Sequence, residues 1–409
     1  MNSRTLIHAL WCFALCVACT FIQIPSGNGS YSSSSKCSYP AVYNFGDSNS
    51  DTGVVYAAFA GLQSPGGISF FGNLSGRASD GRLIIDFITE ELEIPYLSAY
   101  LNSIGSNYRH GANFAAGGAS IRPVYGFSPF YLGMQVAQFI QLQSHIENLL
   151  NQFSSNRTEP PFKSYLPRPE DFSKALYTID IGQNDLGFGL MHTSEEEVLR
   201  SIPEMMRNFT YDVQVSNPKS LVDMIRLRFG YGTNIVMDKF QVLYDVGARV
   251  FWIHNTGPIG CLPTSSIFYE PKKGNLDANG CVIPHNKIAQ EFNRQLKDQV
   301  FQLRRNLPKA KFTYVDVYTA KYELISNASK QGFVNPLEVC CGSYYGYRID
   351  CGKKAVVNGT VYGNPCKNPS QHISWDGVHY TQAANKWVAK HIRDGSLSDP
   401  PVPIGQACL

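Results

Sequence analysis

The sequence is poor in charge and, beyond its N-terminus, has no long apolar run. Charged residues make up 16% of the 409 residues and the formal net charge is +3. There is no lysine-rich run either, which argues against a nucleic-acid partner. No stretch after residue 26 approaches the ~20 apolar residues of a membrane-spanning helix, so we expect no membrane span. The 44% hydrophobic content predicts a globular protein with a sizeable core.

The one long apolar run lies at the N-terminus and is typical of a secretory signal peptide. Arg4 supplies a positive charge, residues 6–24 are mostly apolar, and small residues follow. A membrane anchor is the alternative, but polar residues interrupt the run and no charged flank follows it. We therefore expect residues 1–26 to be cleaved, with the end of this segment approximate, and the mature protein to be secreted.

Cysteine usage agrees with export. Three of the 11 cysteines lie in the predicted signal peptide and eight remain. An even number in a secreted chain predicts disulfides, although spacing alone leaves their pairing open. A zinc site is the alternative, but none of the eight belongs to a Cys-x-x-Cys pair and two are adjacent. The eight are Cys37, Cys261, Cys281, Cys340, Cys341, Cys351, Cys366 and Cys408.

Glycosylation sequons point the same way. Apart from Asn28, which sits near the predicted cleavage site, five Asn-x-Ser/Thr sequences without proline lie in the predicted mature chain and indicate a secreted glycoprotein. They begin at Asn73, Asn156, Asn208, Asn327 and Asn358.

Short apolar runs alternate with amphipathic segments along the chain. Strands are predicted at 41–45, 175–181, 249–253 and 312–317, and helices at 80–92, 134–150, from 194, 288–307 and 381–392. Nearly continuous apolar strands alternating with helices predict an α/β fold, with a parallel sheet covered on both faces. Ligands of such sheets bind beyond the carboxyl ends of the strands, where Ser48 and Asn184 fall.

Three residues could form a nucleophilic centre. A serine hydroxyl attacks an acyl carbonyl only when a base takes its proton, and a carboxylate is needed to orient that base. Asp376 and His379 are three residues apart, so one loop can hold both beside Ser48. His372 is a rival base, but no aspartate precedes it by three. The sequence therefore favours Ser48 as nucleophile, His379 as base and Asp376 as its partner.

Hydrolysis of an ester also needs donors for the negative charge on the carbonyl oxygen. Asn184 offers a side-chain amide at a strand end, Gly118 offers a backbone N–H at a position of close approach, and the Ser48 N–H is the third candidate. Each sequence has a plainer explanation as a turn. We expect Ser48, Gly118 and Asn184 to form an oxyanion hole.

Four sequence blocks strengthen this hypothesis. Residues 46–53, which begin Gly46-Asp47-Ser48, resemble the first block of the GDSL (SGNH) hydrolases, and in particular the plant GDSL esterase/lipase family. Residues 113–118, 182–185 (Gly-x-Asn-Asp) and 376–379 (Asp-x-x-His) match its other blocks in the family's order. Asn49 departs from the leucine that the family's name implies. The resemblance covers about residues 39–408.

The resemblance implies a flavodoxin-like three-layer α/β/α sandwich in one domain, residues 37–408. It implies serine esterase chemistry without a metal or cofactor, with the roles of Ser48, Asp376, His379, Gly118 and Asn184 as above. The expected substrate is a small-molecule or polysaccharide acyl ester in the cell wall or apoplast. Acetylesterases and members labelled α-fucosidases belong to the subgroup resembled.

The segment 215–241 interrupts the pattern. Its flanks, 211–214 and 242–247, would form one continuous helix if joined, and plant members run directly from one flank to the other. We expect an insertion, which a retained intron would explain: valine codons begin GT, and Phe240-Gln241 can be encoded by TTTCAG. A lineage-specific loop is the alternative.

Two other functions compete with ester hydrolysis. A glycosidase needs two carboxylates across the scissile bond, and Asp47, Asp180 and Asp185 are the nearby candidates. A secreted binding protein that is catalytically silent is the third possibility. His110, His254 and His285 are expected to be structural or on the surface, and Phe70, Phe71, Tyr125 and Tyr131 are candidates to line a substrate cleft. The acyl group and the oligomeric state stay open.

Overall fold

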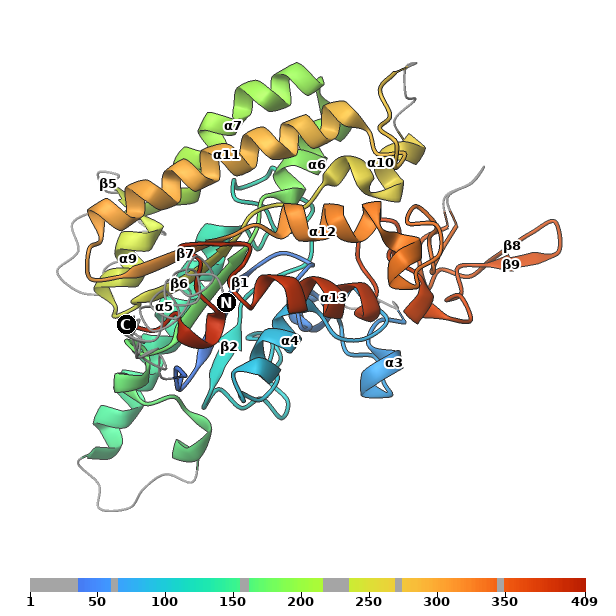
Figure 1. Cartoon of the computed structure of the whole chain (residues 1–409). Helices are drawn as coiled ribbons and strands as arrows, with labels where there is room; N and C mark the ends of the chain where they lie inside the picture. The colour runs from blue at the N-terminus through green and yellow to red at the C-terminus, as the bar shows by residue number, and fades with distance from the viewer. Residues whose placement is uncertain (1–35, 60–64, 155–161, 216–234, 269–273, 344–348) are drawn as a thin grey trace, which may run out of the picture. The chain divides into compact units, whose positions relative to one another are not determined.

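A six-stranded sheet runs through the computed structural model, which describes residues 36–59, 65–154, 162–215, 235–268, 274–343 and 349–409 (Figure 1). The strand order is β10-β7-β6-β3-β1-β2. Five strands are parallel and only the edge strand β10 runs antiparallel. The strands are β1 (Val42–Gly46), β2 (Gly111–Asn113), β3 (Leu176–Asp180), β6 (Val250–His254), β7 (Lys311–Val315) and β10 (Ser398–Asp399).

Helices cover both faces of this sheet (Figure 1). One face carries α4 (Ile84–Glu91), α12 (Val317–Ser326) and α13 (Gln382–Ile392); the other carries α5 (Leu132–Ser154), α7 (Glu195–Thr210), α9 (Lys239–Asp245) and α11 (Ile283–Asn306). Successive strand residues point to opposite faces, so Phe251 joins the core under α11 while Trp252 joins the core under α12. The predicted three-layer α/β/α sandwich, with the flavodoxin-like order of its parallel strands, is confirmed.

Shorter elements connect the layers. The remaining helices are α2 (Val54–Ala58), α3 (Ile68–Phe71), α6 (Gln183–His192) and α10 (Pro263–Phe268). Two small antiparallel pairs are β4 (Tyr211–Val215) with β5 (Ile235–Asp238) and β8 (Ala355–Val357) with β9 (Thr360–Tyr362). The 3-10 turns lie at Lys163–Tyr165, Pro169–Asp171, Ile259–Cys261, Ala328–Gln331, Pro369–Gln371 and Ile404–Gln406. No described helix is both long and apolar enough to span a membrane.

Helix termini follow the sequence signals closely. The Thr381 hydroxyl accepts the Ala384 N–H at 3.3 Å and so caps α13. At the predicted strand 312–317 the expectation is wrong at one end: β7 stops at Val315. The cause is Asp316, whose carboxylate accepts the Thr319 N–H at 3.0 Å. Asp316 thereby caps α12, which begins at the next residue, Val317.

The expected insertion, residues 215–241, begins at the last residue of β4 and ends in the first turn of α9. Residues 216–234 lie outside the described residues, but the two strands that flank them pair antiparallel, with Tyr211 opposite Asp238. In the full chain residues 211–214 belong to β4, and the expectation of one continuous helix applies only to the two flanks when they are joined. The ends of α7 and α9 meet, because the Phe209 and Phe240 rings lie 5.1 Å apart and the Lys239 ammonium donates to the Asn208 carbonyl.

Four disulfides join the eight cysteines whose pairing the sequence left open. They are Cys37–Cys408, Cys261–Cys281, Cys340–Cys366 and Cys341–Cys351. The first closes the described domain on itself, since its cysteines are 371 residues apart. The predicted disulfide framework is confirmed.

Candidate active site

The structure brings Ser48, His379 and Asp376 into one hydrogen-bonded chain. Ser48 follows β1, and its Oγ lies 2.7 Å from His379 Nε2. His379 Nδ1 lies 2.6 Å from Asp376 Oδ2. Ser48 and His379 are 331 residues apart, so the parallel sheet and the packing of α13 are what place them together. This order of atoms lets the imidazole take the serine proton while the carboxylate holds the ring.

A tight turn explains why Asp376 and His379 need a spacing of three. Asp376 Oδ1 accepts the N–H groups of Val378 and His379 at 3.0 and 2.8 Å. Gly377 has φ 90°, a left-handed conformation that glycine adopts without strain. The other oxygen of the same carboxylate is thereby aimed at the imidazole.

Opposite pKa shifts link the two groups. Burial alone would lower the pKa of His379, but the Asp376 charge and hydrogen bond outweigh it, so the net shift is upward. Burial alone would raise the pKa of Asp376, but the charge of His379 and the bonds that Asp376 accepts turn the net shift downward. The pair therefore favours imidazolium beside carboxylate, which is the state that forms when serine gives up its proton.

The turn that carries Ser48 is held by its neighbours. A Cβ at Gly46 would lie 2.3 Å from the Asp180 carbonyl oxygen, so only glycine fits there. Asp47 Oδ1 accepts from the Asn49 backbone at 2.9 Å and from its side chain at 3.1 Å. Asn49, where the family's name implies leucine, thus fixes the turn. Burial and the nearby Asp180 charge raise the pKa of Asp47 to about 7.

The three predicted oxyanion donors belong to neighbouring segments at the carboxyl ends of β1 and β3, where Ala116 bonds to Gly46 and Gly46 is paired with Asp180. Among the described residues, neither the Ser48 N–H nor the Gly118 N–H has an acceptor. Gly118 has φ 75°, a left-handed conformation that glycine adopts without strain. The Asn184 amide gives one proton to the Ala119 carbonyl at 2.8 Å, and its second proton is left for a ligand.

Two buried carboxylates, whose roles the sequence did not reveal, anchor the Gly118 segment. Asp185 accepts the Ile121 N–H at 2.7 Å and the Arg122 N–H at 3.2 Å. Asp51 accepts the Gly117 N–H at 2.8 Å and also caps the start of α2. Both belong to the matched blocks, so their positions were visible although their bonds were not.

The carboxylates considered for a glycosidase lie below the surface. Asp47, Asp180 and Asp185 are 1%, 9% and 0% exposed. Asp185 is engaged by Arg122 and the backbone, and Asp180 faces His254 at 3.5 Å. None of the three is free to reach across a sugar bond.

The other histidines have local partners. His254 is buried against Asp180, and His110 contacts the Pro40 carbonyl at 2.9 Å. His372, the rival base, lies 3.2 Å from Glu338 and 3.5 Å from the Cys366 sulfur. Cys340 and Cys366 form a disulfide, so this cluster offers no thiolate for a metal.

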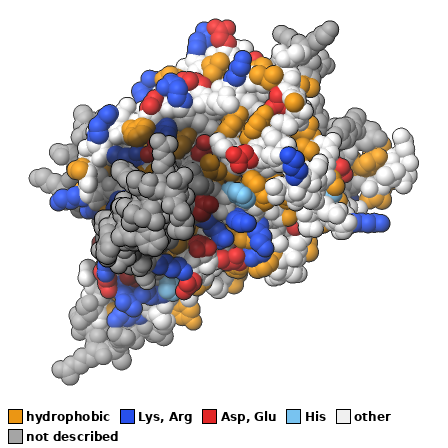
Figure 2. Space-filling view, in the orientation of Figure 1, with side chains coloured by type: hydrophobic (Ala, Val, Ile, Leu, Met, Phe, Trp, Pro, Cys, Tyr) orange, Lys and Arg blue, Asp and Glu red, His pale blue; other side chains and the backbone are white. Residues whose placement is uncertain are grey.

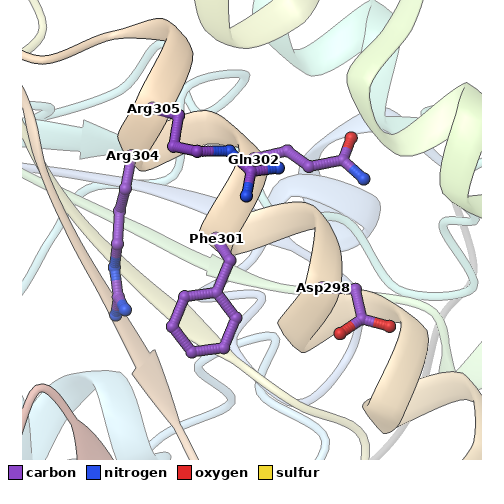
Figure 3. A pocket seen from close by; sticks show the side chains of 5 residues that line it. All are labelled: Asp298, Phe301, Gln302, Arg304 and Arg305. Carbon is purple, nitrogen blue, oxygen red and sulfur yellow. The ribbon is translucent and has the colours of Figure 1, made fainter.

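Four of the five sequons and a surface hollow fall within the described residues. Asn73 and Asn358 are exposed, Asn208 and Asn327 are half-buried, and Asn156 lies outside the described residues. The hollow is lined by the last turns of α11, with Phe301 and Arg304 among its side chains (Figure 3). Because α11 leads into the first residue of β7, the hollow lies at the amino edge of the sheet, opposite to the Ser48 edge.

A serine, a histidine and an aspartate that are linked by hydrogen bonds at the carboxyl edge of an α/β/α sheet form the arrangement of a serine hydrolase. Residues 42–392 match the family described as GDSL-like Lipase/Acylhydrolase. The chain belongs to this family.

Curated relatives agree along nearly the whole chain. A GDSL esterase/lipase of Arabidopsis thaliana is 50% identical and covers 91% of this chain and 90% of its own length. GDSL esterase/lipase ACHE of Zea mays is 47% identical, with 91% and 89% covered. Alpha-L-fucosidase 3 of Arabidopsis thaliana is 43% identical, with 88% and 91% covered. The protein is a carboxylic ester hydrolase of the plant GDSL esterase/lipase group.

Proposed function

We propose that Ser48, His379 and Asp376 hydrolyse an acyl ester through an acyl-enzyme. The Ser48 oxygen attacks the ester carbonyl and its proton passes to His379 Nε2. The C–O bond to the alcohol then breaks, and His379 returns the proton to the departing oxygen. A water molecule next gives a proton to His379 and attacks the acyl group. The bond from the acyl carbon to the Ser48 oxygen then breaks, the acyl group leaves as a carboxylic acid, and His379 returns the proton to Ser48.

In both steps the carbonyl oxygen becomes negative and needs preorganised donors. The N–H groups of Ser48 and Gly118 and the second amide proton of Asn184 supply them. Asp376 stays ionised and stabilises the imidazolium of His379. The observation that carries the proposal is the position of His379 between its two partners. Its Nε2 lies 2.7 Å from Ser48 Oγ, and its Nδ1 lies 2.6 Å from Asp376 Oδ2.

We further propose a short acyl group, acetyl before others, carried by a sugar-bearing alcohol. The resemblance to acetylesterases supports the acyl group. On the face seen in Figure 2, acidic and basic side chains are interspersed. Four disulfides support secretion to the apoplast, and the exposed Asn73 and Asn358 support glycosylation.

The name of one relative, alpha-L-fucosidase, favours a glycosidase as the second candidate. Glycoside hydrolysis uses two accessible carboxylates, and the burial of Asp47, Asp180 and Asp185 speaks against it. A silent binding protein is disfavoured because the serine, the imidazole and the carboxylate are held at reacting distances.

The test is a pair of serine variants on p-nitrophenyl acetate and a fucosyl substrate. Ser48→Ala is expected to lower ester turnover by at least about 10³-fold, since the nucleophile is gone. Ser50→Ala is the matched control, because Ser50 lies two residues away with a buried hydroxyl that has no partner in the described chain. Full esterase activity in Ser48→Ala would refute the mechanism, and serine-independent release of fucose would establish the glycosidase.

A further inference from the structure

Three aromatic side chains gather beside the oxyanion donors and have no role in the proposed reaction. Phe188 of α6 lies 5.7 Å from the Phe127 ring and 6.3 Å from the Tyr125 ring, both in edge-to-face geometry. Rings in this arrangement attract one another weakly and hold a common shape. Tyr125, Phe127 and Phe188 are called the aromatic rim below.

The rim adjoins the donors directly. The Phe127 N–H donates to the Gly118 carbonyl at 2.8 Å, and a Cβ at Gly118 would lie 2.9 Å from Phe127 Cβ. Phe188 follows Asn184 by four residues on α6, which places both on one side of that helix. Phe127 is therefore a neighbour of Gly118, and Phe188 is a neighbour of Asn184 along α6.

The rim is exposed, yet its support is buried. Phe127 is 56% exposed and Tyr125 44%. The Arg122 guanidinium stacks on Tyr125 at 3.9 Å and reaches Asp185 at 3.4 Å, and both Arg122 and Asp185 are buried. The same carboxylate that anchors the Gly118 segment thus fixes the rim. Apolar rings held open to solvent next to a reaction centre indicate a binding surface.

The size of the acyl group decides what this surface contacts. The oxyanion donors hold the carbonyl oxygen about 3 Å away, and an acetyl group ends one bond beyond the carbonyl carbon. Such a group is too small to cover two exposed rings. The alcohol half of the ester is the larger part, so it is the part that can contact the aromatic rim. This step rests on the proposed function, which assigns the short acyl group.

We propose that the aromatic rim is the subsite for the alcohol half of the substrate, and that it packs against the C–H face of a sugar ring. Aromatic faces carry negative partial charge and attract the positive C–H edges of a ring lying over them. The rim would then select sugar esters through binding, while Ser48, His379 and Asp376 act on the acyl group alone.

The experiment compares two acetyl esters whose alcohols leave about equally well, ethyl acetate and methyl 6-O-acetylglucoside, with acetate release as the readout. Phe127→Ala and Phe188→Ala are each expected to raise KM for the glucoside ester roughly three- to tenfold. The kcat for that ester, and kcat/KM for ethyl acetate, are expected to stay within about twofold. Phe301→Ala, an exposed phenylalanine at the opposite sheet edge (Figure 3), is the matched control and is expected to change neither ester.

Unchanged KM for the glucoside ester in both rim variants would overturn the inference. A third substrate, ethyl phenylacetate, carries an aromatic ring on its acyl half. An increase in KM that is confined to this ester would also overturn the inference, because the rim would then bind the acyl half. Full ethyl acetate hydrolysis by Ser48→Ala would instead refute the proposed function on which the inference rests. That outcome is read from a different variant and is therefore distinguishable.

Discussion

At the residue scale, Asp376 shows how one side chain sets both geometry and protonation. One oxygen closes the turn through two backbone N–H groups, and the other faces His379. The pKa of His379 is raised above its ordinary value of about 6.5. A general base works only when neutral, so activity should be lost as the pH falls through this raised value.

Asp376→Asn is therefore expected to change two observables. The loss of the carboxylate charge lowers the pKa of His379, so the acidic limb of the kcat/KM profile should move to lower pH. The loss of the imidazolium partner should also lower kcat by about 10³–10⁴-fold. The pH profile on p-nitrophenyl acetate measures both. Asp394→Asn, an exposed carboxylate at the end of α13, is the control, and an unmoved limb in Asp376→Asn would contradict this account.

Asp185 lies behind the oxyanion donors and touches no substrate in this account. Asp185→Asn replaces one acceptor oxygen by an N–H₂ group, which cannot receive the Ile121 or Arg122 N–H. We expect kcat to fall roughly 10- to 100-fold with KM within about threefold, because the donors act on the transition state. Steady-state kinetics beside a thermal unfolding curve would test this. If kcat falls only as far as the folded fraction falls, Asp185 has a structural role and no effect on the oxyanion donors.

At the element scale, the sequence predicted what depends on local patterns. Apolar runs located β1, β3 and β6, and the predicted helices from 194 and over 381–392 located α7 and α13, whose first turns are capped by Ser194 and Thr381. It missed β2, because Gly111–Asn113 is only three residues long and is specified by pairing with β1. It missed α12 because Val317 continues an apolar run, and only the Asp316 cap ends the strand.

The site shows the same division. Ser48, Asp376 and His379 were named from residue types and spacing, Gly118 and Asn184 from the donors they offer, and the four blocks strengthened all five assignments. The anchoring bonds of Asp51 and Asp185 could not be read from sequence, since they join residues 63 to 66 positions apart. Long-range contacts of this kind exist only once the sheet has brought the loops together.

The β4–β5 pair returns the chain to the end of α7, which fits the proposal that residues 215–241 are an insertion into one helix. Deleting them joins Gln214 to Val242. Val213 then occupies the place of Phe240, two residues before Val242, and an apolar residue still faces the core. We expect the deletion variant to keep kcat/KM within about twofold and to melt at an equal or higher temperature.

Sequencing of the mature transcript tests the origin of the segment separately. We expect most messages to lack it. Messages that run through the segment in most reads would contradict the intron, and a deletion variant that cannot fold would contradict the insertion.

At the scale of the whole molecule, the Cys37–Cys408 disulfide joins the two ends of the described domain. A crosslink restricts the unfolded chain more when it closes a longer loop. Replacing both cysteines by serine should cost about 2–5 kcal/mol of unfolding free energy. The same change at Cys341–Cys351, only 10 residues apart, should cost less. Denaturant unfolding of both variants would test this, and a larger loss at the short loop would contradict the loop-length argument.

The central claim is that this fold assembles a reactive serine at Ser48 from parts spread over the chain. The most direct measurement is covalent labelling of the native protein with a fluorophosphonate probe, followed by peptide mass spectrometry. We predict one adduct, on Ser48, which is greatly reduced in His379→Ala and retained in Ser50→Ala. Absence of label in the native protein, or an adduct on a different serine, would contradict the account.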